Sequence, residues 1–282
     1  MWQRMTRRRL HRKAGRRDAE PLLEEDWGAL WAMQEELVPR AIRRVWSNLP
    51  GSPRCGMCAA PFEGSGSWVV RPLGYRPSRK NPSLCATCVE SSPPGGITMT
   101  IGVLFADLRG FTTRSEGMRP SEVSTLLRRF YGCAEKVLFP EAIIDKLIGD
   151  EVMALYLPPF TSRFNDAGAA DVMVAHSLGL LEAVGYGSVE GPFAELGIGM
   201  DYGEAFVGNI GDRAVYDFTA VGDTVNVASR LQGAAASGEA VLSERLAEAS
   251  GLAGGPTEEV ELKGKAEMQR VVRLTVADRG RV

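Results

Sequence analysis

The 282-residue chain lacks long hydrophobic runs: no stretch approaches the roughly 20 apolar residues that a membrane-spanning helix needs. Its formal net charge is only −2, so the overall charge does not point to nucleic acid or an anionic membrane as a partner. It has two histidines, His11 and His176, and shows no evident Ser–His or Cys–His pair for nucleophilic catalysis. Five cysteines, an odd number without a secretion signal, predict a reducing compartment, and we expect a cytoplasmic protein.

Composition divides the chain into four zones, within a total of 44% hydrophobic and 24% charged residues that is ordinary for a globular protein. Residues 1–17 carry eight Lys or Arg and no acid, and we expect a disordered arm that makes at most weak contact with a membrane surface. Residues 18–50 form a helical segment, residues 51–96 a cysteine-containing module, and residues 97–282 one domain of alternating strand and helix patterns.

The helical segment carries an apolar face between Glu24 and Trp46, interrupted near Pro39. Three of the five tryptophans lie here. The same stripe would be buried by packing against the chain's own main domain or by pairing with a second subunit, and the sequence favours neither.

Residues 51–96 hold seven of the sixteen prolines among many glycines, so we expect them to be too irregular for a core of their own. They also hold two Cys-x-x-Cys pairs separated by 26 residues: Cys55 with Cys58, and Cys85 with Cys88. Two such pairs suit tetrahedral coordination of one structural zinc, as in a zinc ribbon, and the metal would supply folding free energy. An iron–sulfur cluster or a redox pair is the less favoured alternative. Cys133 lies in a predicted amphipathic helix, as a small buried residue.

Two acidic turns follow strand-like segments of the main domain. The segment 98–112 is an apolar strand that ends in Asp107 and turns at Gly110 into a helix, and Asp150 lies at the tip of a predicted hairpin formed by 143–149 and 151–157. If the two strands are neighbours, the aspartates face each other and can share Mg²⁺ or Mn²⁺. Backbone N–H groups of 108–112, which include those of Gly110, Phe111 and Thr112, then suit a polyphosphate.

Two further segments complete the pattern. GIGMDYGEAFVGNIG (197–211) predicts a glycine-punctuated strand pair. AVGDTVNVASRL (220–231) turns at Gly222 and enters a helix that carries Asn226 and Arg230 one turn apart.

Taken together, FADLRGFT, DKLIGDEVMALY, GEAFVGNIG, VGDTVNVASRL and ELKGKAEM resemble the class III nucleotidyl cyclases, in the family's order and across 97–276. The resemblance implies an α+β domain with a ferredoxin-like βαββαβ core. It also implies conversion of ATP to 3′,5′-cyclic AMP and pyrophosphate with two Mg²⁺ or Mn²⁺ per active site.

The resemblance assigns roles by position. Asp107 and Asp150 correspond to the two metal carboxylates, with help from the Leu108 carbonyl. Asn226 corresponds to the residue that orients the ribose, and Arg230 to the one that stabilises charge on the α-phosphate.

Three further residues correspond to nucleotide contacts in this family. Lys263 resembles the lysine that contacts the triphosphate, with Lys265 as a close competitor. Lys146 aligns with the purine-reading lysine of adenylate cyclases and Thr219 with its partner, and this pair favours ATP over GTP. Because the family builds each site from two subunits, the resemblance implies a homodimer.

The segment KVLFPEAIIDK lacks paired glycines that are common in the family, and Met200 and Asp201 stand where a histidine is usual. We expect the helical segment and the zinc module to regulate the enzyme by setting how the two subunits are placed. Three alternatives stay open: a guanylate or mixed-specificity cyclase, a domain that binds nucleotide only to signal, and a basic arm and cysteine module that bind nucleic acid, although we expect no nucleic-acid partner.

Overall fold

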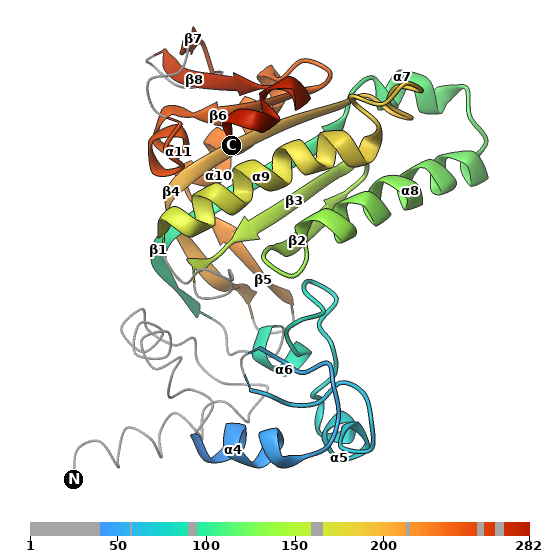
Figure 1. Ribbon diagram of the computed structural model, residues 1–282, viewed down its shortest axis with the longest axis vertical. Helices are drawn as coiled ribbons and strands as arrows, with labels where there is room; N and C mark the ends of the chain where they lie inside the picture. Colours follow the sequence, from blue (N-terminus) through green and yellow to red (C-terminus); the bar gives the residue numbers. More distant parts are fainter. Residues whose placement is uncertain are drawn as a thin grey trace. The chain divides into compact units, whose positions relative to one another are not determined.

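A computed structural model of the chain describes residues 40–282, except Met57 and the segments 90–94, 159–165, 213–214, 253–256 and 263–267. The basic arm and most of the helical segment therefore lie outside the described residues. The chain divides into two compact units, drawn in Figure 1: Met1–Met99 with Phe206–Val221, and Thr100–Ala205 with Gly222–Val282. Among the described residues, no helix is both long and apolar enough to cross a membrane.

The larger unit is built on a mixed sheet in the order β2-β3-β1-β4-β6-β8-β7. The strands β1, β2 and β3 pair antiparallel, β4 and β6 pair parallel, and β6, β8 and β7 pair antiparallel. The strand bounds are β1 Gly95–Leu108, β2 Ile143–Ile148, β3 Glu151–Tyr156, β4 Leu196–Asp212, β6 Glu239–Ser243, β7 Glu258–Val260 and β8 Gln269–Leu274.

Helices α8 (Pro120–Leu138) and α9 (Asp166–Val184) lie side by side across one face of this sheet (Figure 1). Pro120 begins α8, where a missing backbone N–H costs nothing. The helix then buries Leu126, Phe130, Ala134 and Leu138, which are four residues apart and so share one side. The described part of this unit also has the short helices α7 Phe111–Glu116, α11 Glu244–Ala249 and η3 Val276–Arg281.

Helix α10 (Asp223–Ala234) covers the opposite face of the sheet. Along β6, Ala240 and Leu242 join the core under α8 and α9, whereas Val241 joins a second core with Val227 and Leu231 of α10. This alternation is the two-residue period of a strand. Gly199 of β4 lies directly beneath α10, where a Cβ atom would collide with the backbone of Gln232.

The expected strand pair at 197–211 is wrong, because β4 is one continuous strand. Its first part pairs with β6, and its second part, from Phe206 to Asp212, pairs with β5 (Val215–Val221) in the smaller unit. The glycines therefore mark close approaches of backbone, as at Gly199, or of a side chain, as at Gly203, and not a turn.

Elsewhere in the smaller unit, the described residues form the short helices α4 Arg40–Asn48, α5 Ser67–Val70, η1 Arg71–Leu73 and α6 Ala86–Val89. The Arg54 guanidinium donates hydrogen bonds to the carbonyls of Trp46, Leu49 and Ala59, which ties the end of α4 to the first cysteine pair. The expectation that residues 51–96 have no core is also wrong, since Phe62, Val70, Leu84 and Val89 are buried there.

An ion pair with a buried carboxylate holds the start of α10 in place. Asp201 of β4 is fully buried and receives two hydrogen bonds from the guanidinium of Arg245 in α11. The same guanidinium lies 3.4 Å from the Thr224 hydroxyl, which itself donates to the Glu204 carbonyl at 2.7 Å. Gly203 leaves the room that Arg245 needs. Asp201 thus links β4, α11 and the first turn of α10.

We predict that Arg245→Met lowers the free energy of unfolding by about 3 kcal/mol, because it leaves the Asp201 carboxylate buried without its partner. The double variant Arg245→Met with Asp201→Asn removes the charge as well and recovers most of that loss. Urea unfolding measures both. Arg270→Met, which breaks the exposed pair with Glu244, serves as the control. A loss for Arg245→Met no larger than for this control would contradict the account.

Candidate functional site

The turn between β2 and β3 places Asp150 next to the end of β1. Asp107 lies opposite Glu151 in the register of β1 and β3, so it is the neighbour of the hairpin tip. The Leu108 N–H donates to the Asp150 carbonyl at 3.4 Å, and Gly149 adopts a φ of 63° that favours glycine. The predicted hairpin and the predicted approach of Asp107, Leu108 and Asp150 are both present.

A hydrogen bond from helix α8 also holds the tip of this hairpin. The Tyr131 hydroxyl donates to the Gly149 carbonyl at the tip. Burial, with the nearby Asp150 charge, raises the pKa of Tyr131, so it remains a donor at neutral pH. Sequence reasoning missed Tyr131, because nothing in the local pattern links position 131 to a turn 18 residues later.

The surroundings of Asp107 disfavour its charged form. Partial burial and the neighbouring Asp150 carboxylate raise the pKa of Asp107 to about 6, against an ordinary value of 3.8. Burial, Asp107 and Asp150 also raise the pKa of Glu151. Sequence reasoning missed Glu151, although it adjoins the Gly-Asp turn and pairs with Asp107 across the sheet.

One cation of the chain partly offsets this charge. An Arg109 nitrogen lies 3.8 Å from the Asp107 carboxylate, and the same guanidinium donates to the Gln232 carbonyl in α10. The side chain fits there because Gly197 has no Cβ atom to block it. Sequence reasoning also missed Arg109, which directly follows the two residues assigned to metal binding.

These residues fit a divalent cation. Two carboxylates are held together where burial and mutual repulsion outweigh the single nearby arginine, and the pKa of Asp107 rises as a result. Carboxylate and backbone oxygens are the ligands that Mg²⁺ and Mn²⁺ prefer, and a bound cation would remove the repulsion.

The chain turns sharply immediately after these acids. Gly110 has a φ of 65° and directly precedes α7, which begins at Phe111. Phe111 packs against the large core, whereas Thr112 is exposed. The predicted helix start at 110–112 is therefore confirmed, two residues beyond Leu108.

An irregularity in β2 sets the direction of the Lys146 side chain. The pairing of β2 with β3 shifts between Ile144 and Lys146, and the extra residue, Asp145, is buried. Such a bulge re-directs the side chains that follow it. The Lys146 ammonium lies 3.7 Å from the Asp145 carboxylate, and its side chain remains 40% exposed.

The other residues with expected nucleotide roles lie on separate elements. Asn226 and Arg230 lie one turn apart on α10, and Asn226 is exposed while Arg230 is half-buried. Thr219 is buried in β5 and belongs to the smaller unit, whereas Lys146 belongs to the larger unit. Lys263 and Lys265 lie outside the described residues.

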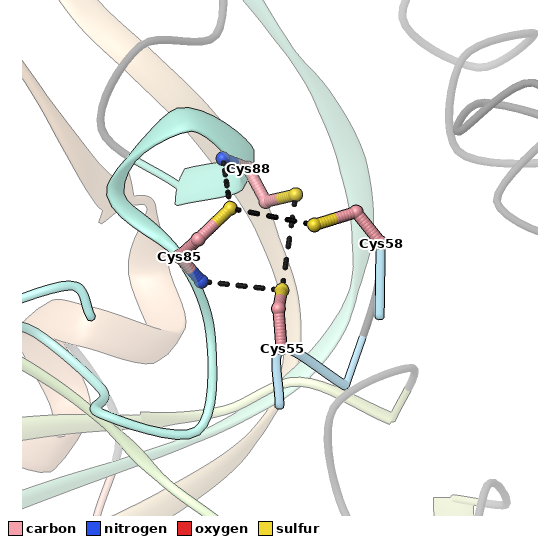
Figure 2. A group of neighbouring side chains, drawn as sticks. All are labelled: Cys55, Cys58, Cys85 and Cys88. Carbon is pink, nitrogen blue, oxygen red and sulfur yellow. Dashed lines mark hydrogen bonds between the residues drawn. The ribbon is translucent and has the colours of Figure 1, made fainter. Parts of the chain in front are cut away.

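The four predicted cysteines converge in the smaller unit, as Figure 2 shows. The sulfurs of Cys55, Cys58, Cys85 and Cys88 all lie within 4.8 Å of one another, and no pair of them forms a disulfide. The Cys58 and Cys85 sulfurs are 3.7 Å apart, and those of Cys55 and Cys88 are 4.0 Å apart.

Backbone amides also point at this cluster. The Cys85 N–H donates to the Cys55 sulfur at 3.2 Å, and the Cys88 N–H donates to the Cys85 sulfur at 3.3 Å (Figure 2). Hydrogen bonds with neighbouring thiols lower the pKa of Cys55, and the thiolate formed there raises the pKa of Cys88. At this distance four thiolates would repel one another, and one bound metal ion would neutralise that repulsion. The four sulfurs therefore fit a metal site.

His176 and Cys133 have no assigned role, and they differ in how far they are buried. His176 lies against Tyr156, whose hydroxyl is 3.0 Å from its Nδ1 atom, and burial lowers the pKa of His176 to about 4. His176 is therefore neutral at physiological pH. Cys133 is only half-buried on α8, so its prediction as a buried residue is wrong.

A family model described as the adenylate and guanylate cyclase catalytic domain matches residues 97–273. The chain belongs to this family. It is 33% identical over 137 residues to an adenylate cyclase of Anabaena cylindrica, a match that covers 48% of this chain and 27% of that protein. The cyclase domain therefore spans about a quarter of this curated relative's length.

Two solved structures share the fold of the cyclase domain. The guanylyl cyclase Cya2 is 30% identical, with a TM-score of 0.53, and the match covers 64% of this chain and 93% of that chain. The adenylyl cyclase CyaB from P. aeruginosa, at 24% identity and a TM-score of 0.55, supports the fold alone, over 62% of this chain and 93% of that chain. The resemblance seen in the sequence and the α+β fold that it implied are confirmed.

The charge at Asp107 gives a pH prediction for the cyclase domain without added Mg²⁺ or Mn²⁺. Because the folded state raises the pKa of Asp107 to about 6, it binds the proton more tightly than the unfolded chain does. The stabilisation is full below the ordinary value of 3.8 and is lost as the pH rises through about 6. Asp107→Asn should raise Tm by about 2 to 4 °C at pH 8 and by less than about 1 °C at pH 4.

Thermal unfolding at the two pH values measures this difference. Glu135→Gln, which removes an exposed carboxylate from α8, is the control. Its change in Tm should be the same at both pH values. Added Mn²⁺ should stabilise the wild type but not Asp107→Asn. Equal melting temperatures of wild type and Asp107→Asn at pH 8 would show that the two carboxylates do not repel each other.

Proposed function

We propose that the chain is an adenylate cyclase that converts ATP to 3′,5′-cyclic AMP and pyrophosphate at the interface of a homodimer. The observation that carries this proposal is the pairing of Asp107 with Asp150, two carboxylates held close enough to raise the pKa of Asp107. Membership of the cyclase family and the similarity to an adenylate cyclase of Anabaena cylindrica support it.

In the proposed reaction the 3′-hydroxyl oxygen attacks the α-phosphorus, the bond to the bridging oxygen of the β-phosphate breaks, and pyrophosphate leaves. The hydroxyl proton passes to solvent. Asp107 and Asp150, with the Leu108 carbonyl, would hold two Mg²⁺ or Mn²⁺. Such cations lower the pKa of the hydroxyl and neutralise charge on the triphosphate.

The remaining contacts fall to the chain's own polar groups. Backbone N–H groups at 110–112 would bind phosphate oxygens. The Arg230 guanidinium would stabilise charge on the α-phosphate through paired hydrogen bonds, and Asn226 would orient the ribose. Lys263 or Lys265 would contact the triphosphate. Asn226 is exposed in the single chain, which is consistent with a role in a partner's site.

The choice of ATP rests on Lys146 and Thr219, which would read the purine. A guanylate or mixed-specificity cyclase is the second candidate, because the 30% identical structure Cya2 is a guanylyl cyclase. A domain that binds nucleotide without catalysis would have no chemical need for Asp107, Asp150, Asn226 and Arg230 together, so we favour an enzyme.

For the smaller unit we propose a structural Zn²⁺ held by the four cysteines, with an iron–sulfur cluster as the alternative. Four sulfur donors with backbone N–H groups directed at two of them support this choice. We further propose that this module and the helical segment before it regulate the cyclase. Five cysteines without a disulfide suit a reducing compartment, and the cytoplasm is the proposed location.

Mixing two inactive variants tests the shared site. In a heterodimer of Asp107→Ala and Arg230→Ala, one of the two sites keeps both residues. An equal mixture, in which half the dimers are mixed, should recover about a quarter of wild-type activity by random assortment. Cyclic AMP formation by the re-associated mixture measures it.

The matched control mixes Asp107→Ala with Asp150→Ala. Both changes lie in the metal-binding half, so neither site of that heterodimer is intact and no activity should return. Recovery in the control, or none in verified heterodimers of the first pair, would contradict a site shared between two subunits.

A further inference from the structure

A lysine of the cysteine module contacts the strand that carries Thr219. The Lys80 ammonium lies 2.8 Å from the Asp217 carboxylate and donates to the Phe218 carbonyl at 2.5 Å. The side chain of Lys80 is only 14% exposed, and both of its partners precede Thr219 in β5. All four residues belong to the smaller unit.

The contact acts on the peptide that leads into Thr219. The Phe218 carbonyl and the Thr219 N–H belong to one planar peptide group, so fixing the carbonyl fixes the direction of that N–H. Among the strands that the structure describes, β5 pairs with β4 alone. Its outer edge therefore depends on side chains such as Lys80, and a charged donor makes a strong hydrogen bond.

The loop that carries Lys80 is built into the cysteine cluster. The Ser78 N–H donates to the Leu84 carbonyl at 2.8 Å and closes the loop directly before Cys85. The Gly56 N–H, between the first two cysteines, donates to the Ser83 carbonyl at 2.9 Å. A change in how the four sulfurs are held would therefore move the backbone from which Lys80 projects.

A second contact joins the start of β1, the strand that follows the module, to β4. At Gly96 a Cβ atom would collide with the Val207 carbonyl, and at Gly208 one would collide with the Gly95 carbonyl. Gly208 is the partner of Thr219 in the pairing of β4 with β5. The hairpin is thus contacted near Thr219 on both of its strands, by Lys80 of the module on β5 and by the start of β1 on β4.

We propose that Lys80 is a positioning residue for Thr219, through which the metal in the cysteine cluster sets the enzyme's affinity for its nucleotide. This inference rests on the proposed function, in which Thr219 reads the purine. With the cluster filled, Lys80 holds the Phe218 peptide and Thr219 meets the base. With the cluster empty, the loop loosens and the nucleotide binds more weakly.

The test uses the full-length protein, with its zinc content measured, and the variant Lys80→Met. KM for ATP should rise about fivefold while kcat changes less than about twofold, because binding is lost and not chemistry. Hydrogen exchange at the Thr219 amide should be about tenfold faster, while exchange in β3 should not change. Lys80→Arg keeps the charge and should restore both values.

Arg76→Met, at an exposed position four residues before Lys80, is the control and should match wild type. Removing zinc with a chelator should reproduce the faster Thr219 exchange in wild type and add little to Lys80→Met. An unchanged Thr219 exchange rate in Lys80→Met would overturn the proposal, as would an equal effect of chelation in both proteins. If no variant forms a cyclic nucleotide, the proposed function fails, while the exchange data still decide whether Lys80 links the cluster to β5.

Discussion

The close approach of Asp107 to Asp150, in partly buried surroundings that disfavour charge on Asp107, is the constraint around which the site in the larger unit is built. Their separation is set by the antiparallel pairing of β1 with β3 and by the glycine turn at position 149. Neighbouring groups maintain this arrangement: Tyr131 holds the turn from α8, and Arg109 neutralises part of the charge. The fold thus keeps two acids in a position that costs stability without a cation, which is typical of sites that serve chemistry.

Polar contacts between neighbouring elements, as well as packing, hold the residues with expected catalytic roles in place. Helix α10, which carries Asn226 and Arg230, packs closely on Gly199, and its first turn is tied to the buried Asp201–Arg245 pair. In the smaller unit, Lys80 of the cysteine module donates a hydrogen bond to the Phe218 carbonyl, directly before Thr219. Supporting contacts of this kind decide how accurately a site is preorganised, so they are natural places for regulation to act.

The sequence predicted the features that depend on local order. The hairpin at Asp150, the helix after Gly222 and the cysteine cluster follow from strand-like runs around a Gly-Asp turn, from helical spacing and from paired Cys-x-x-Cys spacing. It did not predict the contacts of Tyr131, Arg109 and Lys80, because each joins segments that only the tertiary fold brings together. It also failed at 197–211, because the glycines there leave room for α10 and for neighbouring groups such as Arg245 and do not break the strand.

The most direct test of the account is product formation from ATP by the wild type and by Asp150→Asn, which keeps the shape of the side chain and removes its charge. The account predicts that the wild type forms cyclic AMP and pyrophosphate in equal amounts, only with Mg²⁺ or Mn²⁺ present. It predicts that Asp150→Asn loses at least about a hundredfold in rate. Product formed without a divalent cation, or an Asp150→Asn variant as active as wild type, would contradict it.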